Sequence, residues 1–161
     1  MSDIRLRPAS VADVATIVTL VRQMLVAMTA YGGAAPATDG QSWIKVRDAV
    51  RRDIEGGEAC YILAGTGAGE VVGLASGEII TLGGVFAPER TMHVSTLYVD
   101  PSFRRRGLGG RLLGQVLAWG REQRVTRCTL NVLVANPARE LYRAAGFEDL
   151  EMKMSLDFAA P

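Results

Sequence analysis

The stretch from Asp100 to Leu113 joins a predicted strand to a predicted helix through a turn rich in arginine and glycine. Glycines let the backbone approach a ligand closely, and the unpaired amides at a helix start point, with the positive end of the helix dipole, toward a bound anion. The residues concerned are Arg104, Arg105, Arg106, Gly107, Gly109, Gly110 and Arg111. The turn is therefore a candidate phosphate-binding loop, and a strand after its helix should run parallel to the strand before it.

Two other phosphate-binding motifs are absent from the sequence. It contains no Gly-x-x-x-x-Gly-Lys-Ser/Thr motif and no Gly-x-Gly-x-x-Gly motif after a strand, which excludes the two common nucleotide-binding fingerprints. A Gly-x-Gly pair beside arginines also occurs in ordinary loops, so this turn needs support from the rest of the chain.

Length and composition indicate a globular chain with one core. With 161 residues, 48% of them hydrophobic and 22% charged, one domain over residues 1–161 is expected. The 18 basic residues nearly balance the 17 acidic ones, so the arginine cluster is local and the net charge is only +1. Nucleic acid is therefore not an expected partner.

Two cysteines and one histidine are too few for the usual four-ligand zinc site. Cys60 and Cys128 each lie in an apolar run and are expected to be reduced core thiols, so no metal is predicted. The first residues lack the pattern of a signal peptide, and no uninterrupted apolar run is long enough to cross a bilayer. The expectation is a cytoplasmic protein with no membrane partner.

Hydrophobic periodicity predicts an α/β (α+β) chain. Ser10 and Asp13 form a candidate start for the first helix, and Gly73 and Gly77 suggest a bend or bulge within a strand. The expected strands are 4–7, 59–64, 70–80, 91–99, 127–134 and 152–158, and the expected helices are 10–28, 42–55, one packing through residues 108–117, and 137–145. The second and third strands should form a hairpin, and residues 30–40 should form a loop.

In this order, two motifs resemble the GNAT superfamily of acyl-CoA-dependent N-acetyltransferases. The first runs from Leu97-Tyr98-Val99-Asp100-Pro101 into Arg104-Arg105-Arg106-Gly107-Leu108-Gly109, and the second is Asn136 followed by Leu141-Tyr142 and Gly146-Phe147. The resemblance covers nearly the whole chain. It implies a mixed, mainly antiparallel sheet flanked by helices, with a central parallel strand pair that splays apart to hold coenzyme A.

The resemblance also implies which residues bind acetyl-CoA. The pyrophosphate would rest on the loop, the pantetheine arm would pair with the preceding strand, and the Leu97 amide would polarise the thioester carbonyl. Asn136 would hold the pantetheine arm from the other strand. The implied cofactor-binding residues are Leu97, Tyr98, Val99, Arg104, Arg105, Arg106, Gly107, Leu108, Gly109, Gly110, Asn136 and Tyr142.

Tyr142 matches the family tyrosine that protonates the departing thiolate. The alternative is a helix tyrosine that anchors the core. Two residues are candidates for the base that accepts the proton of the amine. His93 lies on the strand that feeds the loop, with the same alternation parity as Leu97, and Glu78 lies on the neighbouring strand and could act through a water. His93 could instead satisfy hydrogen bonds at a strand end, and some family members have no dedicated base.

The expected reaction is direct attack by an amine of a small molecule or peptide, with both substrates bound. Residues 30–40 should help form the acceptor side, with Tyr31 and Trp43 as candidate substrate-binding residues, although Trp43 could simply pack under the loop. Homodimerisation is a further expectation from the family. The alternative function is a non-catalytic acyl-CoA-binding or regulatory domain.

Overall fold

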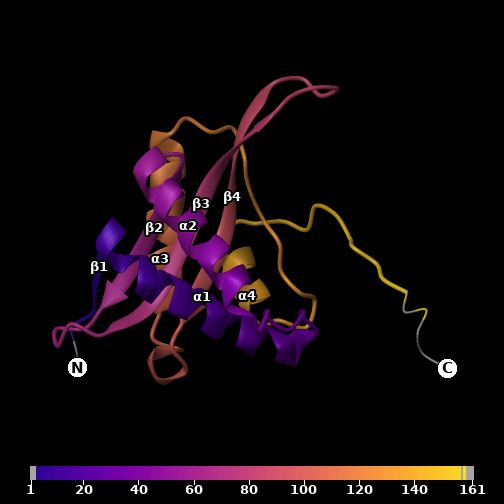
Figure 1. Cartoon of the computed structure of the whole chain (residues 1–161). Helices are drawn as coiled ribbons and strands as arrows, with labels where there is room; N and C mark the ends of the chain where they lie inside the picture. The colour runs from indigo at the N-terminus through magenta and orange to yellow at the C-terminus, as the bar shows by residue number, and fades with distance from the viewer. Residues whose placement is uncertain (1–2, 157, 159–161) are drawn as a thin grey trace.

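The computed structural model describes residues 3–156 and 158 and contains a five-stranded sheet flanked by helices (Figure 1). Its order is β1-β2-β3-β4-β5, with antiparallel neighbours except for the parallel pair β4 and β5. The strands are β1 (Arg5–Pro8), β2 (Ala59–Gly65), β3 (Val71–Leu82), β4 (Glu89–Val99) and β5 (Cys128–Leu130). The α-helices are α1 (Val14–Met28), α2 (Gly40–Gly56), α3 (Leu108–Glu122) and α4 (Ala138–Ala144). The predicted mixed sheet and β2–β3 hairpin are confirmed.

The core has two parts, one on each face of the sheet (Figure 1). On one face, α1 and α2 pack on the sheet through Val14, Ile17, Leu20 and Val50 against Leu63, Leu74 and Tyr98. On the other, α3 packs through Leu108, Leu112, Leu113 and Val116 against Ile62, Ala75, Met92 and Val94. The sheet therefore separates two environments. A strand residue contacts either α1 and α2 or α3, depending on the face to which its side chain points.

The first helix starts as the sequence predicts. The Ser10 amide donates to Asp13 Oδ2 at 2.8 Å, which forms a capping box, and Arg7 pairs with Asp13 at 2.7 Å. A 3₁₀ turn over Val11–Asp13 then leads into α1. The buried residues of α1 are Val14, Ile17 and Leu20.

The segment Val11–Tyr31 is long and apolar enough, by length and composition alone, to cross a membrane. Asp13 and Arg22 interrupt it, which is why the sequence shows no uninterrupted apolar run. In the structure this segment contains α1, whose Ile17 and Leu20 pack against the sheet. A helix that packs into a core can meet the same criterion as a membrane span.

A β-bulge in β4 changes which side chains share a face. Ser76 pairs with Thr96 and Gly77 pairs with Val94, so Ser95 is the extra residue. The predicted irregularity is present at both glycines. Beside Gly73 the extra residue is Val72 of β3, because Ala64 pairs with Gly73 and Gly65 with Val71, whereas opposite Gly77 the inserted residue lies in β4. The reason for a glycine at position 77 is different, since an added Cβ there would lie 2.8 Å from Val116 Cγ1 of α3. Gly77 therefore allows α3 to approach the sheet closely.

The bulge corrects the prediction that His93 and Leu97 share a face. Met92, Val94 and Leu97 all contact the core on the α3 side. His93 lies between Met92 and Val94, so it points to the α1/α2 side. One inserted residue between His93 and Leu97 reverses the alternation beyond it.

Two predicted strands differ from the structure. β5 covers only Cys128–Leu130 of the expected 127–134, because the chain leaves the sheet after Leu130 and turns toward α4, where the Asn136 amide donates to the Leu133 carbonyl. Residues 152–156 of the expected strand 152–158 have no regular structure, and residue 157 lies outside the described residues. A period of two specifies strand alternation, but a strand also needs a neighbouring edge, and among the described residues no strand pairs with this segment.

Candidate active site

β4 and β5 separate partway along their length. They pair in parallel only from Met92 to Val94, opposite Cys128 to Leu130. β4 then continues to Val99 while the described residues after Leu130 leave the sheet. The parallel pair therefore opens into a gap bounded by the second half of β4.

The backbone amides of Leu97 and Val99 face this gap. The Asp100 amide donates to the Val72 carbonyl on the β3 side at 2.9 Å. Because amides alternate in direction along a strand, those of Leu97 and Val99 point away from β3. The other end of β4 gives the same result. The Met92 amide donates toward β5, away from β3, and the extra residue Ser95 shifts the alternation by one, so the Leu97 and Val99 amides also point away from β3. Two donors that have no partner among the described residues thus line the gap.

The gap ends at the arginine- and glycine-rich loop and the start of α3. Asp100 Oδ1 accepts from the Ser102 amide at 2.8 Å and sets the first turn after β4. Arg105 and Gly107 then adopt left-handed conformations, with φ of 61° and 74°. Gly107 is the N-cap of α3, so the unpaired amides of the first helical turn emerge at this loop.

The glycines leave room in front of these amides. A Cβ added at Gly107 or Gly110 would meet no atom within 4 Å, whereas one at Gly109 would lie 3.2 Å from Leu141 Cδ1. Gly109 therefore permits the contact between α3 and α4, and the open space lies at the other two positions. Open space, free amides and a helix N-terminus together fit the pyrophosphate of a coenzyme.

The loop arginines hold the loop in shape as well as adding charge. Arg104 Nε donates to the Val99 carbonyl at 2.8 Å, and its guanidinium lies 5.9 Å from the centre of the Tyr98 ring. Arg111 donates to the Ile4 carbonyl at 2.9 Å. All of these arginines are exposed, but among the described residues Arg105 makes no side-chain hydrogen bond or ion pair, in contrast to Arg104 and Arg111. The four arginines are thus not equivalent, which the sequence alone did not reveal.

Tyr142 lies on α4 and is half-buried. Its ring packs edge-to-face on Phe147, with 6.1 Å between ring centres. Burial raises the pKa of Tyr142 above its usual value of 10, so the phenol stays protonated at neutral pH. The residue thus anchors the core, as the alternative predicted, and keeps the proton that an acid catalyst needs.

Glu78 and His93 are cross-strand neighbours on β3 and β4. Ser95, the bulged residue, donates from Oγ to Glu78 Oε1 at 2.8 Å. His93 Nδ1 lies 3.0 Å from Thr129 Oγ1 on β5. The structure therefore joins both candidate bases to two hydroxyl side chains that the sequence did not mark, because neither the bulge nor the register with β5 can be read locally.

Glu78 lines a pocket of about 330 Å³ between the end of α2 and the edges of β2 and β3. Its walls are formed by Arg52, Asp53, Gly56, Glu58, Ala59, Glu78 and Ile79. Asp53 accepts a hydrogen bond from the Tyr61 hydroxyl at 2.9 Å, and burial together with this bond raises the pKa of Tyr61. Three carboxylates and Arg52 line the pocket, and Glu58 also pairs with Arg90 at 3.4 Å, so one negative charge is left in excess and the pocket favours a cation.

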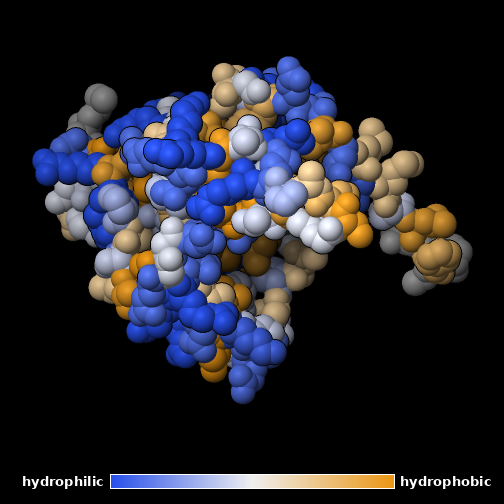
Figure 2. All heavy atoms as spheres, turned by 90° about the horizontal axis from the view of Figure 1, so that it is seen from above, coloured by the Kyte–Doolittle hydropathy of each residue, from blue (hydrophilic) through white to orange (hydrophobic). Residues whose placement is uncertain are grey.

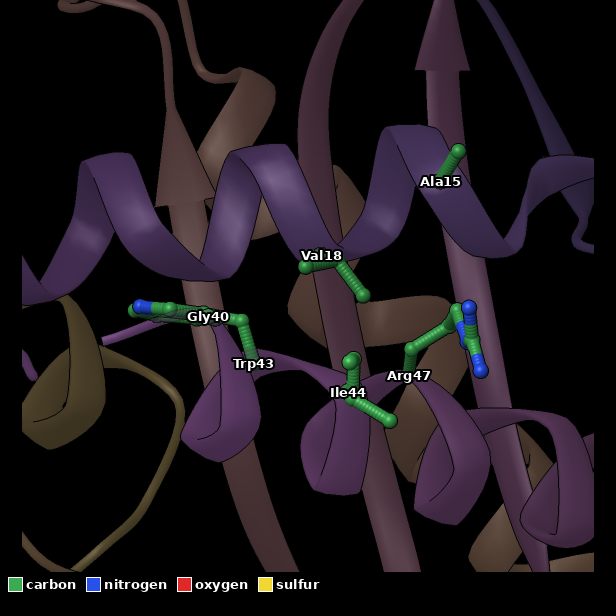
Figure 3. A pocket seen from close by; sticks show the side chains of 6 residues that line it. All are labelled: Ala15, Val18, Gly40, Trp43, Ile44 and Arg47. Carbon is green, nitrogen blue, oxygen red and sulfur yellow. The ribbon is translucent and has the colours of Figure 1, made fainter. Parts of the chain in front are cut away.

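Trp43 lies in a different place, the groove of about 280 Å³ between α1 and α2 shown in Figure 3. Val18 of α1 points toward Trp43 and Ile44 of α2, and no residue of the arginine/glycine loop lines the groove (Figure 3). Trp43 Nε1 donates to the Ala37 carbonyl at 2.8 Å, which holds the α1–α2 loop in place. Packing under the loop is the role the geometry gives Trp43, whereas Tyr31 lies in the 3₁₀ turn Thr29–Tyr31 that begins this loop.

Asn136 connects α4 to α1. Its Oδ1 accepts from the Ala138 amide at 2.9 Å, and its Nδ2 lies 3.3 Å from Met28 Sδ. The first contact lies at the start of α4, whose N-cap is Pro137, and the second brings the end of α1 beside the loop between β5 and α4. The α1–α2 loop and this loop are therefore neighbours.

The cysteines show no nucleophilic environment. Burial raises the pKa of both Cys60 and Cys128 to about 11, so both thiols are protonated at neutral pH. Among residues 3–156 and 158, no group of three His, Cys, Asp or Glu side chains is placed to hold a metal ion.

Comparison with known proteins places these features in context. The family model described as the acetyltransferase (GNAT) family matches residues 28–147. An uncharacterized protein of Mycobacterium leprae is 36% identical over 103 residues, which cover 63% of this chain and 26% of that protein. The match thus spans about a quarter of the length of that curated relative.

Three solved structures illustrate the likeness in fold. A predicted acetyltransferase from Clostridium acetobutylicum, determined with acetyl-CoA, has a TM-score of 0.80 at 16% identity, covering 96% of each chain. A tetramutant of the BH1408 protein from Bacillus halodurans has a TM-score of 0.78 at 18% identity, covering 96% of this chain and 99% of that one. The aminoglycoside N-acetyltransferase AAC(6')-Iy in complex with CoA has a TM-score of 0.73 at 18% identity, covering 99% and 97%.

Proposed function

This chain belongs to the GNAT acetyltransferase family, and from that premise we propose that it moves an acetyl group from acetyl-CoA to an amine of a small molecule or peptide. The observation that carries the proposal is the gap between β4 and β5, which has two unpaired amides along one side and the glycine loop at its end. An extended pantetheine arm can pair with such an edge as an added strand would.

The proposed coenzyme site follows the gap. The amides at the start of α3, with Arg105 beside them, would bind the pyrophosphate, and the backbone of Leu97 and Val99 would bind the pantetheine arm. Bound there, acetyl-CoA supplies an activated thioester. The Leu97 amide would donate to the thioester oxygen, on which negative charge develops during attack.

Tyr142 is the proposed general acid. Burial keeps its phenol protonated, so the hydroxyl can donate its proton to the departing thiolate sulfur. Glu78 is the proposed base, because Ser95 orients its carboxylate and because it lines the acidic pocket. His93 remains the competing base, and Thr129 would then fix its ring.

The proposed transfer is direct, with the acceptor amine attacking the thioester carbonyl while both substrates are bound. The protonated, half-buried Cys60 and Cys128 thiols favour this route over an acetyl-cysteine intermediate. The carboxylates around Glu78 favour an acceptor that is cationic before it loses its proton. A cytoplasmic location stays a prediction from the sequence.

The test is thiol release from acetyl-CoA with a panel of amines, amino acids, polyamines, aminoglycosides and peptide N-termini. We expect turnover with at least one cationic class, and we expect acetyl-CoA to raise the melting temperature of the protein. A rise in melting temperature without turnover on any acceptor would favour the alternative, a non-catalytic acyl-CoA-binding domain. No rise and no turnover would remove the coenzyme site from the proposal.

A further inference from the structure

The pocket beside Glu78 carries charges of both signs in its walls. Its volume is about 330 Å³, and Arg52 and Asp53 of α2 line it together with Glu78 of β3. This volume is at the lower end of the range for small-molecule sites, about 300–1,000 Å³. Figure 2 shows mostly hydrophilic residues over the end of the molecule where α2 finishes. The pocket therefore suits a small polar molecule, and its charges indicate which kind.

Arg52 supplies a positive charge that the fold does not use. Among the described residues its guanidinium makes no hydrogen bond or ion pair, whereas Glu58, in the same wall, pairs with Arg90 at 3.4 Å. An arginine presents a planar fork of N–H groups that matches a carboxylate. The pocket thus offers a binding group for a carboxylate beside its groups for cations.

Asp53 is a carboxylate that the sheet holds in place. The Tyr61 hydroxyl of β2 donates to Asp53 Oδ2 at 2.9 Å. Tyr61 lies two residues after Ala59, which pairs with Glu78 across the strands, so Tyr61 and Glu78 are on the same face of the sheet. Burial raises the pKa of Tyr61 most, and the negative charges of Asp53 and Glu78 raise it further. Both carboxylates therefore lie close to one hydroxyl.

The order of these charges matches an amino acid that has a second amine in its side chain. Arg52 and Asp53 are consecutive in α2, and the carboxylate and α-ammonium groups of an amino acid are likewise joined to one carbon. Glu78 is the second carboxylate, and its partner Ser95 lies two residues before Leu97, whose amide is the proposed contact of the thioester. Such an amino acid carries a net charge of +1, which balances the single negative charge in excess.

We propose that the acceptor is a small diamino acid of the lysine or ornithine type. Arg52 binds its carboxylate, Asp53 binds its α-ammonium group, and Glu78 receives its side-chain amine. Tyr61 is the positioning residue for Asp53. This assignment rests on the proposed function and adds the class of acceptor to it.

The reaction then proceeds at the side-chain nitrogen. The ammonium group gives one proton to the Glu78 carboxylate, the neutral nitrogen bonds to the thioester carbonyl carbon, and the carbon–sulfur bond breaks. The departing sulfur takes the Tyr142 proton, and the second proton of the amine returns to the Tyr142 oxygen. The products are an amino acid acetylated on its side chain and the free thiol of coenzyme A.

Three acceptors that differ by one charged group test the assignment. Lysine has all three groups, ε-aminocaproate lacks the α-ammonium group, and cadaverine lacks the carboxylate. We expect kcat/KM to be about tenfold lower for each of the last two than for lysine, because each leaves one charged partner unused. Mass spectrometry should find the acetyl group on the side-chain nitrogen. Acetylation of the α-nitrogen, or equal kcat/KM for lysine and cadaverine, would overturn the assignment.

Arg52→Gln and Asp53→Asn separate the two contacts. Arg52→Gln should lower kcat/KM for lysine about tenfold but not for cadaverine, which has no carboxylate. Asp53→Asn should lower it for lysine but not for ε-aminocaproate, and Tyr61→Phe should act in the same direction. Arg51→Gln is the matched control, because Arg51 is exposed on α2 and does not line the pocket. An equal loss on all three acceptors in Arg52→Gln would overturn the carboxylate contact.

Binding measurements keep this assignment separate from the proposed function. Calorimetric titration of lysine, with and without coenzyme A, reports on the pocket without requiring turnover. Turnover of another amine without any binding of lysine would overturn the diamino acid and leave the acetyl transfer standing. Binding of lysine that Arg52→Gln weakens about tenfold, together with no turnover of any acceptor, would support the pocket and contradict the proposed reaction.

Discussion

At the scale of single residues, the candidate site depends on which hydrogen-bonding groups are already occupied. Arg104 and Asn136 both match the family motifs, yet each has partners within the chain that stabilise the local structure. Tyr142 is the proposed acid because burial keeps it protonated, and Glu78 is the proposed base because it contacts Ser95. Substitutions at these residues separate structural roles from catalytic ones.

Tyr142→Phe tests the proposed acid. Loss of the hydroxyl should lower kcat by about 10²–10⁴-fold, the usual contribution of a positioned proton donor. The acetyl-CoA-induced rise in melting temperature should persist, because the ring still packs on Phe147. Steady-state kinetics and thermal melts provide the two readouts, and a kcat within a factor of a few of wild type would contradict the assignment.

Glu78→Gln and His93→Ala distinguish the two candidate bases. The acidic limb of the kcat/KM profile reports the ionisation of the essential base in the free enzyme. We expect Glu78→Gln to remove this limb and lower the rate at neutral pH, and His93→Ala to retain the limb. The reverse pattern would make His93 the base and Thr129 the residue that orients it.

Asp13→Asn tests the start of the first helix. Hydrogen bonds from Arg7 hold the pKa of Asp13 well below its usual range. The pKa of this carboxyl in the unfolded chain is about 4, so the carboxylate stabilises the fold fully above that pH. The contribution is lost as the pH falls toward the pKa of the folded state. We expect the variant to be about 1 kcal/mol less stable at pH 7. In denaturant titrations, the difference from wild type should shrink below pH 4.

At the scale of elements, the end of β4 and the start of α3 form the proposed coenzyme site. The bulge at Ser95 directs the Leu97 and Val99 amides into the gap, and the left-handed Gly107 ends the loop and begins the helix. Both features belong to the backbone, so neither requires a particular side chain to contact the coenzyme. Added bulk in the loop should therefore weaken coenzyme binding more than the loss of one charged side chain does.

Gly110→Ala and Gly114→Ala form a matched pair on α3. A Cβ at either position meets no atom within 4 Å, so each alanine should stabilise the free protein by about 0.4–1 kcal/mol. Only Gly110 lies in the proposed loop, so Gly110→Ala should reduce the acetyl-CoA-induced rise in melting temperature, while Gly114→Ala should leave it unchanged. Equal rises in both variants would place the coenzyme elsewhere.

At the scale of the whole molecule, the sheet holds two cores that share its strands. The cluster on the α3 side includes Cys60 and Cys128 at its margin, so the reactivity of these thiols reports how often that side opens. Burial raises their pKa to about 11. The native state therefore contains very little thiolate at pH 8.

This predicts slow modification of both cysteines by a disulfide reagent at pH 8. With so little thiolate, the rate in the native protein should be on the order of a hundred-fold below that of an unperturbed cysteine of pKa about 8.5. Denaturant should restore the full rate for both. Rapid native reaction would instead indicate a local opening at β2 or β5, which hydrogen exchange would detect.

The sequence by itself determined what depends on neighbouring residues. The capping box at Ser10, the glycine and arginine loop, the β2–β3 hairpin and the order of the elements were all predicted, because turn chemistry and periodicity act over a few residues. The same local motifs led to the family and its coenzyme.

Only the tertiary structure decided what depends on pairing between distant segments. The bulge at Ser95 placed His93 and Leu97 on opposite faces, and the register with β5 placed Thr129 beside His93. Packing of α1 against α2 placed Trp43 in a groove that no residue of the arginine- and glycine-rich loop lines. The regular alternation of residues 152–158 predicted a strand but could not supply its partner, because a strand forms only where another chain segment presents an edge.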